Sequence, residues 1–104
     1  MPWDRKIIWL VLSRENITVS NAVKTLTAGN LVTKFVYAQV QIQDQSVRLT
    51  VDGTDPNPAT PLGQEWAAGA VLNVWGHESA SNLKMIREGA SDAHVEVVYY
   101  GEGS

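Results

Sequence analysis

Residues 35–43 read Phe-Val-Tyr-Ala-Gln-Val-Gln-Ile-Gln, and they carry the clearest indication of the fold class. From Gln39 onward, glutamine alternates with an apolar residue. A repeat of two is the period of a β-strand, because successive side chains of a strand point to opposite faces. The stretch therefore predicts a strand with one buried and one outward face. The buried set is Val36, Ala38, Val40 and Ile42, and the outward set is Gln39, Gln41 and Gln43.

The next segment repeats the alternation. Residues 47–51 read Val-Arg-Leu-Thr-Val, with Val47, Leu49 and Val51 on the side expected to face inward. Only Asp44-Gln45-Ser46 separates this segment from the first one. A connection this short favours an antiparallel hairpin, so we expect the two strands to pair with each other.

The rest of the chain predicts further short strands joined by turns. The expected strands are residues 7–12, 17–27, 70–75, 83–87 and 94–100, with 17–27 read as one strand or as two strands broken near Asn21. The apolar run 7–12 is expected to be covered on both faces, and a short buried helical segment is the alternative. Residues 52–69 predict a long loop because of their prolines and glycines. Residues 77–82 predict a polar connection.

About seven short antiparallel strands, with turns at roughly 8–12-residue spacing, indicate an all-β fold. We expect a small β-sandwich or jelly-roll-like domain that comprises residues 1–104. Residues 1–8 are a candidate for an extended N-terminal arm. Residues 101–104, Gly-Glu-Gly-Ser, are expected to form a flexible tail.

Composition excludes several classes of function. The 104 residues carry a net charge of −3, and the eight basic residues are scattered, so the basic stripe that nucleic acid requires is absent. No segment is long and apolar enough to span a membrane, so we expect no membrane partner. There is no cysteine, which excludes disulfides and thiolate chemistry. Charged residues make up 18 %, which suggests that a partner covers part of the surface.

Motifs for catalysis or cofactors are missing from the sequence. No serine lies in a G-x-S-x-G context, and no glycine-rich phosphate loop occurs, so we expect neither enzymatic activity nor a cofactor. The loop from Asp52 to Asp55 offers two carboxylates, but calcium requires more ligands, and an Asx turn explains the same residues. His77 and His94 lack the partners of a zinc site, and we expect structural or interface roles for both.

Four tryptophans are an excess for so short a chain. Trp9 and Trp75 lie within apolar strands, so we expect them in the core. Trp3, near the N-terminus, and Trp66, in the long loop, are candidates for anchors at an interface. The outward row Gln39, Gln41 and Gln43 is either an ordinary exposed face or an uncharged interface, and His94, which alternates with Glu96, is a further interface candidate.

One stretch resembles a motif of a known group of proteins. Residues 47–56, Val-Arg-Leu-Thr-Val-Asp-Gly-Thr-Asp-Pro, are similar to the V-R-x-T-x-D-G-T-x-P strand and turn of small tailed-bacteriophage virion proteins. In that group an A-G turn, a strand and a late strand ending V-x-Y follow. Their counterparts here are Ala68-Gly69, Val71-Leu72, and then residues 83–87 and 95–99. The similarity covers residues 34–100, and a related turn occurs in β-sandwich appendage domains of some glycoside hydrolases.

The resemblance implies a structural protein without catalytic residues. We expect a protein of the virion, assembled in the cytoplasm of the host bacterium, that decorates the capsid as a cement protein. Its expected partners are copies of itself, in a homo-oligomer for which a trimer is one expected form, and the major capsid protein or another virion protein. The alternative is a carbohydrate- or receptor-binding β-sandwich module of a tail or fibre, which would use Trp3, Trp66 and the loop of residues 52–63.

Overall fold

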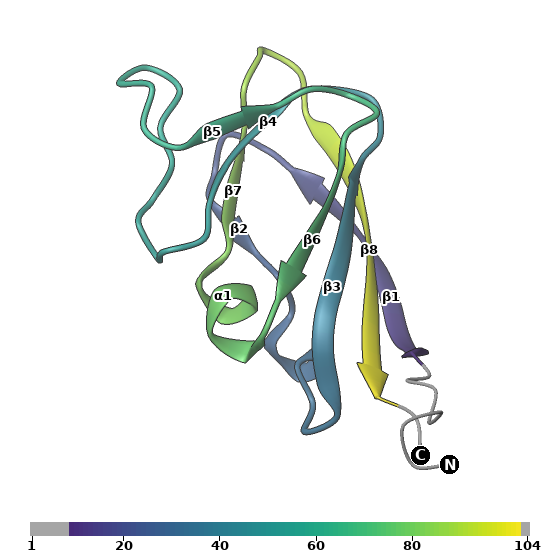
Figure 1. Cartoon of the computed structure of the whole chain (residues 1–104). Helices are drawn as coiled ribbons and strands as arrows, with labels where there is room; N and C mark the ends of the chain where they lie inside the picture. Colours follow the sequence, from purple (N-terminus) through teal and green to yellow (C-terminus); the bar gives the residue numbers. More distant parts are fainter. Residues whose placement is uncertain (1–8, 103–104) are drawn as a thin grey trace, which may run out of the picture.

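The computed structural model describes residues 9–102 (Figure 1). Eight strands and two short helices follow one another along this part of the chain. The strands are β1 (Trp9–Val19), β2 (Lys24–Thr25), β3 (Phe35–Ile42), β4 (Val47–Thr50), β5 (Gln64–Trp66), β6 (Val71–Trp75), β7 (Lys84–Arg87) and β8 (Ala93–Glu102). The helices are the 3₁₀ turn η2 (Ala28–Asn30) and α1 (His77–Asn82). Neither helix is long and apolar enough to cross a membrane.

The strands form two antiparallel sheets of four strands each, so the predicted all-β sandwich is confirmed. The first sheet has the order β1-β8-β3-β6, and the second has the order β2-β7-β4-β5. The long strands β1, β3 and β8 all belong to the first sheet. The second sheet is built from strands of two to four residues.

The core lies between the sheets and confirms the alternation read from the sequence. Ala38, Val40 and Ile42 of β3 are fully buried. Val47 and Leu49 of β4 join the same apolar cluster from the second sheet. Burying a side chain of this size contributes about 1.5–3 kcal/mol. The two alternating segments therefore hold the layers together.

The predicted hairpin between residues 35–43 and 47–51 is wrong. β3 pairs with β8 on one side and with β6 on the other, so it has no free edge for β4. The short turn after Ile42 instead carries the chain from the first sheet to the second. The apolar faces of both strands still meet in the core. Val51, expected to face inward, is 45 % exposed because β4 ends at Thr50.

The N-terminal strand also differs from the prediction. β1 is one strand of 11 residues that includes the polar residues 13–16, and residues 17–27 contribute only its last part and the short β2. The apolar side chains at its start are not covered on both faces. Trp9, Leu10 and Val11 are 39 %, 44 % and 59 % exposed. Trp9 and Val11 point to the side of this edge strand that no second layer covers. Residues 7 and 8 lie outside the described residues.

Two further segments are more ordered than expected. The polar connection of residues 77–82 forms α1. Strand β8 continues through Glu102, whereas we expected the tail to begin at Gly101. Gly101 is buried, and a Cβ atom there would lie 2.5 Å from the Lys34 carbonyl oxygen and 2.7 Å from a Leu12 methyl. Only glycine fits this contact.

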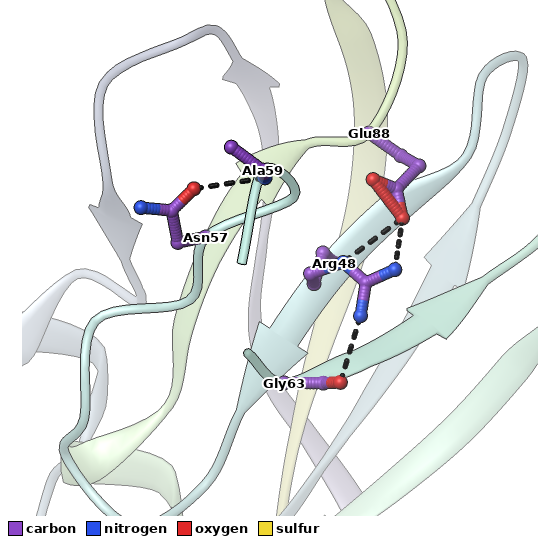
Figure 2. Close-up of polar contacts among 5 residues, drawn as sticks. All are labelled: Arg48, Asn57, Ala59, Gly63 and Glu88. Atoms are coloured by element: carbon purple, nitrogen blue, oxygen red, sulfur yellow. Dashed lines mark hydrogen bonds and ion pairs between the residues drawn. The ribbon is translucent and has the colours of Figure 1, made fainter. Parts of the chain in front are cut away.

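Polar contacts attach the long loop to the second sheet (Figure 2). The Arg48 guanidinium pairs with the Glu88 carboxylate, with its Nε 2.9 Å from Oε1, and donates a hydrogen bond to the Gly63 carbonyl at 2.9 Å. Asn57 closes a turn by accepting a hydrogen bond from the Ala59 amide at 2.9 Å. The side chains of Arg48 and Glu88 are only 11 % and 17 % exposed. These contacts among Arg48, Glu88 and Gly63, here called the clamp, therefore hold the end of the loop against β4.

Candidate binding face

The side of the first sheet that points away from the core carries an unusual set of side chains, here called the outer face. Cross-strand register aligns its residues in rows. One row contains Val11, Tyr100, Tyr37 and Trp75, and the next contains Arg14, Val98, Gln39 and Asn73. A third row contains Asn16, Glu96, Gln41 and Val71. The outer face thus grades from aromatic residues at one end to amides in the middle.

Four rings gather at the aromatic end and form the aromatic cluster of Trp9, Tyr37, Trp75 and Tyr100. Tyr37 stacks on Tyr100 at a centroid distance of 4.7 Å and on Trp75 at 4.3 Å. Trp9 meets Tyr37 and Trp75 edge-on, at 5.7 and 6.0 Å. Offset stacked and edge-to-face pairs add about 0.5–1.5 kcal/mol each beyond area burial. The cluster is therefore a preorganised apolar block.

The aromatic cluster is open to solvent in the isolated chain. Trp75 is 54 % exposed and Trp9 is 39 % exposed, so the prediction that both lie in the core is wrong. Their strands contribute to the core through other residues: in β6, Leu72 and Val74 point inward while Trp75 points outward. Partial burial, and the neighbouring Tyr100, raise the pKa of Tyr37 above its ordinary value.

The predicted glutamine row lies on the outer face, next to the aromatic cluster. Gln39 is half-buried, and Gln41 and Gln43 are exposed. Gln43 accepts a hydrogen bond from the Asn16 amide at 3.0 Å, which reaches across β8. In the middle of this face the charges of Arg14 and Glu96 are paired with each other, at 2.9 Å. The middle of the face therefore presents mainly neutral amides.

His94 lies at the end of the outer face farthest from the aromatic cluster. Its Nδ1 atom is 2.7 Å from Asp44 Oδ2, and its backbone N–H donates to Asp44 Oδ1 at 2.8 Å. These hydrogen bonds from His94 lower the pKa of Asp44. Both side chains are almost half exposed. The pair pins the turn after β3 to the start of β8, and an interface role for His94 stays a prediction.

Trp66 does not join this face. It lies in β5 of the second sheet and packs against the core. Its indole N–H is buried and has no hydrogen-bond partner within the described residues. Trp66 also lines a groove of about 400 Å³ between the second sheet and β6, together with Leu49, Leu72 and Trp75. Trp3 lies outside the described residues.

The aromatic cluster is the feature that sequence reasoning missed. Tyr37 lies two residues before Gln39 and four before Gln41, so its side chain is on the same face of the strand, and the outward row begins at Tyr37 rather than at the glutamines. Tyr100 is likewise an even number of residues from His94 and Glu96, so the three side chains lie on the same face of their strand. This spacing was enough to predict that Tyr37 and Tyr100 point outward. The association of the four rings was not readable, because it depends on which strands become neighbours.

The loop from Asp52 to Asp55 serves as a turn. Asp52 accepts a hydrogen bond from the Thr54 amide at 3.0 Å, which confirms the Asx turn and lowers the pKa of Asp52. Gly53 has a φ of 86°, the left-handed conformation that glycine adopts without strain. Asp55 pairs with Lys84 at 2.9 Å. Among residues 9–102, no three His, Asp or Glu side chains converge as metal ligands would.

Comparison with protein-family models, curated proteins and solved structures finds no match to this chain. The features of this chain that indicate a function are the chemistry of the outer face and the motif of residues 47–56.

Proposed function

We propose that this chain is a non-enzymatic structural protein of a bacteriophage virion, which decorates the head shell by binding through its outer face. The observation that carries the proposal is the exposed aromatic cluster at one end of that face. Trp75 and Val11 remain 54 % and 59 % exposed in the single chain. Exposed aromatic residues that are clustered and preorganised are typical of the central residues of protein interfaces.

The packing of the rings favours a protein partner over a sugar. A sugar ring stacks on an open aromatic face, but both faces of Tyr37 are covered, by Tyr100 on one side and Trp75 on the other. The cluster acts as one block rather than as separate platforms. A protein surface can surround such a block and exclude water from it, which is the usual arrangement of a binding hot spot.

The polar part of the outer face suits the same partner. Gln39, Gln41 and Asn73 can each donate and accept hydrogen bonds. Burying an amide that finds a partner costs far less than burying an unpaired charge. Since Arg14 and Glu96 already neutralise each other, the middle of the face can be covered without leaving either charge unpaired. Neutral amides beside an aromatic block therefore suit an interface that is buried against a partner protein.

The assignment to a phage particle is supported by the motif of residues 47–56. In this chain the motif residues hold the scaffold: Arg48 clamps the loop end, and Asp52 and Gly53 form the turn. A motif with structural roles fits a group of proteins related by scaffold rather than by catalysis. The partners would be the major capsid protein and further copies of the chain, and the location would be the virion.

A carbohydrate- or receptor-binding module is the second candidate. Trp75 favours it, because its half-exposed ring lies in the row next to the amides of Gln39 and Asn73. The exposed part of the Trp75 ring offers an apolar surface to a sugar, and the neighbouring amides can donate and accept hydrogen bonds. Binding of the isolated monomer to a glycan array, abolished by Trp75→Ala, would replace the shell proposal with this one.

The test uses purified particles of the phage that encodes the chain. Mass spectrometry should find the protein in the virion in many copies, and particles lacking it should release their DNA at a lower temperature. Re-adding the wild-type protein should restore heat resistance, whereas Trp75→Ser should bind at least about tenfold more weakly. Leu62→Ser is the matched control, because Leu62 is 45 % exposed in the long loop and away from the outer face.

Two results would contradict the proposal. One is a virion that contains no copies of the protein. The other is equal loss of binding in the Trp75 and Leu62 variants, which would mean that the outer face has no special role.

A further inference from the structure

The four edges of the two sheets differ in how well they are protected against pairing with another strand. An exposed edge presents unpaired N–H and C=O groups, and proteins usually protect it with charges, bulges or short length. β1 carries a bulge between Val11 and Ser13 and the charged residues Arg14 and Glu15. β2 has two residues and β5 has three, with Lys24 and Glu65 among them. β6 lacks all of these protections.

Strand β6 ends the first sheet and reads Val-Leu-Asn-Val-Trp (Figure 1). It has five residues, no charge and no proline. Its outward side chains are exposed, with Val71 at 49 % and Trp75 at 54 %. An uncharged, mainly apolar edge of this kind is a template for an added strand.

The hydrogen-bond pattern shows which backbone groups face the open edge. The Ile42 amide donates to the Ala70 carbonyl, and the Gly76 amide donates to the Val36 carbonyl, each at 2.8 Å. Because the direction alternates along an antiparallel pair, the even-numbered residues of β6 turn their backbone groups toward β3. Val71, Asn73 and Trp75 therefore turn theirs toward the open edge.

The side-chain order of β6 is symmetric about Asn73. If a second β6 lies antiparallel across a two-fold axis at Asn73, Asn73 faces its own copy and Val71 faces Trp75 of that copy. The Asn73 side-chain amides of the two copies then meet, and each apolar Val71 meets an apolar Trp75. The backbones of each facing pair exchange two N–H···O hydrogen bonds. No charge is buried, since β6 has none. An isologous contact of this kind is self-complementary.

We propose that β6 of one copy pairs antiparallel with β6 of a second copy across a two-fold axis at Asn73, joining the two first sheets into one continuous sheet. The pairing brings the two aromatic clusters to the same side of that sheet. Leu72 and Val74 of each copy meet on the inner side, beside the groove that Leu49 and Trp66 line. The inference refines the self-association part of the proposed function, with a dimer in place of a trimer.

The experiment measures the mass of the protein in solution. Sedimentation equilibrium over roughly 1–100 µM should give twice 11.4 kDa for the wild type. Asn73→Asp and Asn73→Lys each place like charges across the axis, so each should raise the dimer dissociation constant by on the order of tenfold or more. An equimolar mixture of the two variants should restore the dimer, because opposite charges then face each other. Circular dichroism verifies that both variants remain folded.

The control places the same charges on the other edge of the sheet. Thr18 is exposed on β1, and Thr18→Asp or Thr18→Lys should leave the mass unchanged. A monomeric or trimeric wild type overturns the inference, and so does a dimer that both Asn73 variants leave intact. If the mixture of the Asn73→Asp and Asn73→Lys variants stays monomeric, the register that places residue 73 opposite its own copy is wrong. Particle binding is a separate readout, so failure of the shell proposal leaves this result standing.

Discussion

The Tyr99 hydroxyl donates a hydrogen bond to the Glu15 carboxylate beneath the first sheet, where β8 and β1 face the turn η2. The same carboxylate accepts hydrogen bonds from the Thr27 hydroxyl at 2.6 Å and from the Asn30 side-chain amide at 3.2 Å. Burial by itself would raise the pKa of Glu15, but the hydrogen bonds from Thr27, Tyr99 and Asn30 outweigh it and lower the pKa. Burial and the Glu15 charge raise the pKa of Tyr99.

Removing this hydrogen bond should destabilise the fold. Tyr99 is fully buried, and Tyr99→Phe keeps the ring but deprives the carboxylate of a donor. Hydrogen bonds to a charged group contribute about 1.5–3 kcal/mol, so the free energy of urea unfolding should fall by roughly that amount. Tyr100→Phe, on the opposite face of the same strand, is the control and should change it by less than about 0.5 kcal/mol. Equal losses in both variants would contradict the role assigned to Tyr99.

The same network predicts a loss of stability in acid. The pKa of Glu15 is lower in the folded chain than its ordinary value of about 4.3, so the unfolded chain binds the proton more readily. The stabilisation is complete above that value and disappears as the pH falls through the folded pKa. Melting temperatures between pH 7 and pH 3 should therefore fall more steeply for the wild type than for Glu15→Gln. If the melting temperatures of the wild type and Glu15→Gln fell in parallel, titrating groups other than Glu15 would account for the loss of stability in acid.

Breaking the clamp of Figure 2 should cost more than removing an ordinary surface ion pair. Arg48→Met strands the Glu88 carboxylate, which is only 17 % exposed, and leaves the Gly63 carbonyl without its donor. We expect a loss of about 2–4 kcal/mol in urea unfolding. Arg48→Met combined with Glu88→Leu should recover part of it, because no charge is then left unpaired. Arg14→Met, in an exposed pair, should cost less than about 1 kcal/mol.

A single added methyl should distinguish two glycines. At Gly101 the new Cβ would lie 2.5 Å from a backbone oxygen, which cannot move without disturbing the sheet. Gly101→Ala should therefore lower the free energy of unfolding by at least about 2 kcal/mol. At Gly89 no atom lies within 4 Å, so Gly89→Ala should be neutral or slightly stabilising. Comparable destabilisation by both substitutions would mean that strand β8 does not pack at Gly101 as described.

The alternation of residues 35–42 was readable from the sequence because it reflects local backbone geometry. Successive strand residues point to opposite sides whatever the neighbouring strands are. Val40, Ile42, Val47 and Leu49 were predicted to face inward, and all are buried. The Asx turn at Asp52 was equally local, since the bond it makes spans only two residues.

Pairing between strands was not readable in the same way. A short turn after Ile42 favours a hairpin, yet β8 and β6, from far along the chain, occupy both edges of β3. Which strand occupies an edge depends on a competition among contacts distant in sequence. A repeat of two describes a strand's faces and says nothing about its neighbours.

Local patterns were enough to predict an all-β chain, the inward residues of its central strands and the turn chemistry, because each depends on a few adjacent residues. The tertiary structure, by contrast, brings together Trp9, Tyr37, Trp75 and Tyr100, which come from four different strands of one sheet. It also decided that Trp9 and Trp75 lie outside the core. An apolar side chain is buried only where a second layer covers it, and the sheet order leaves this face uncovered.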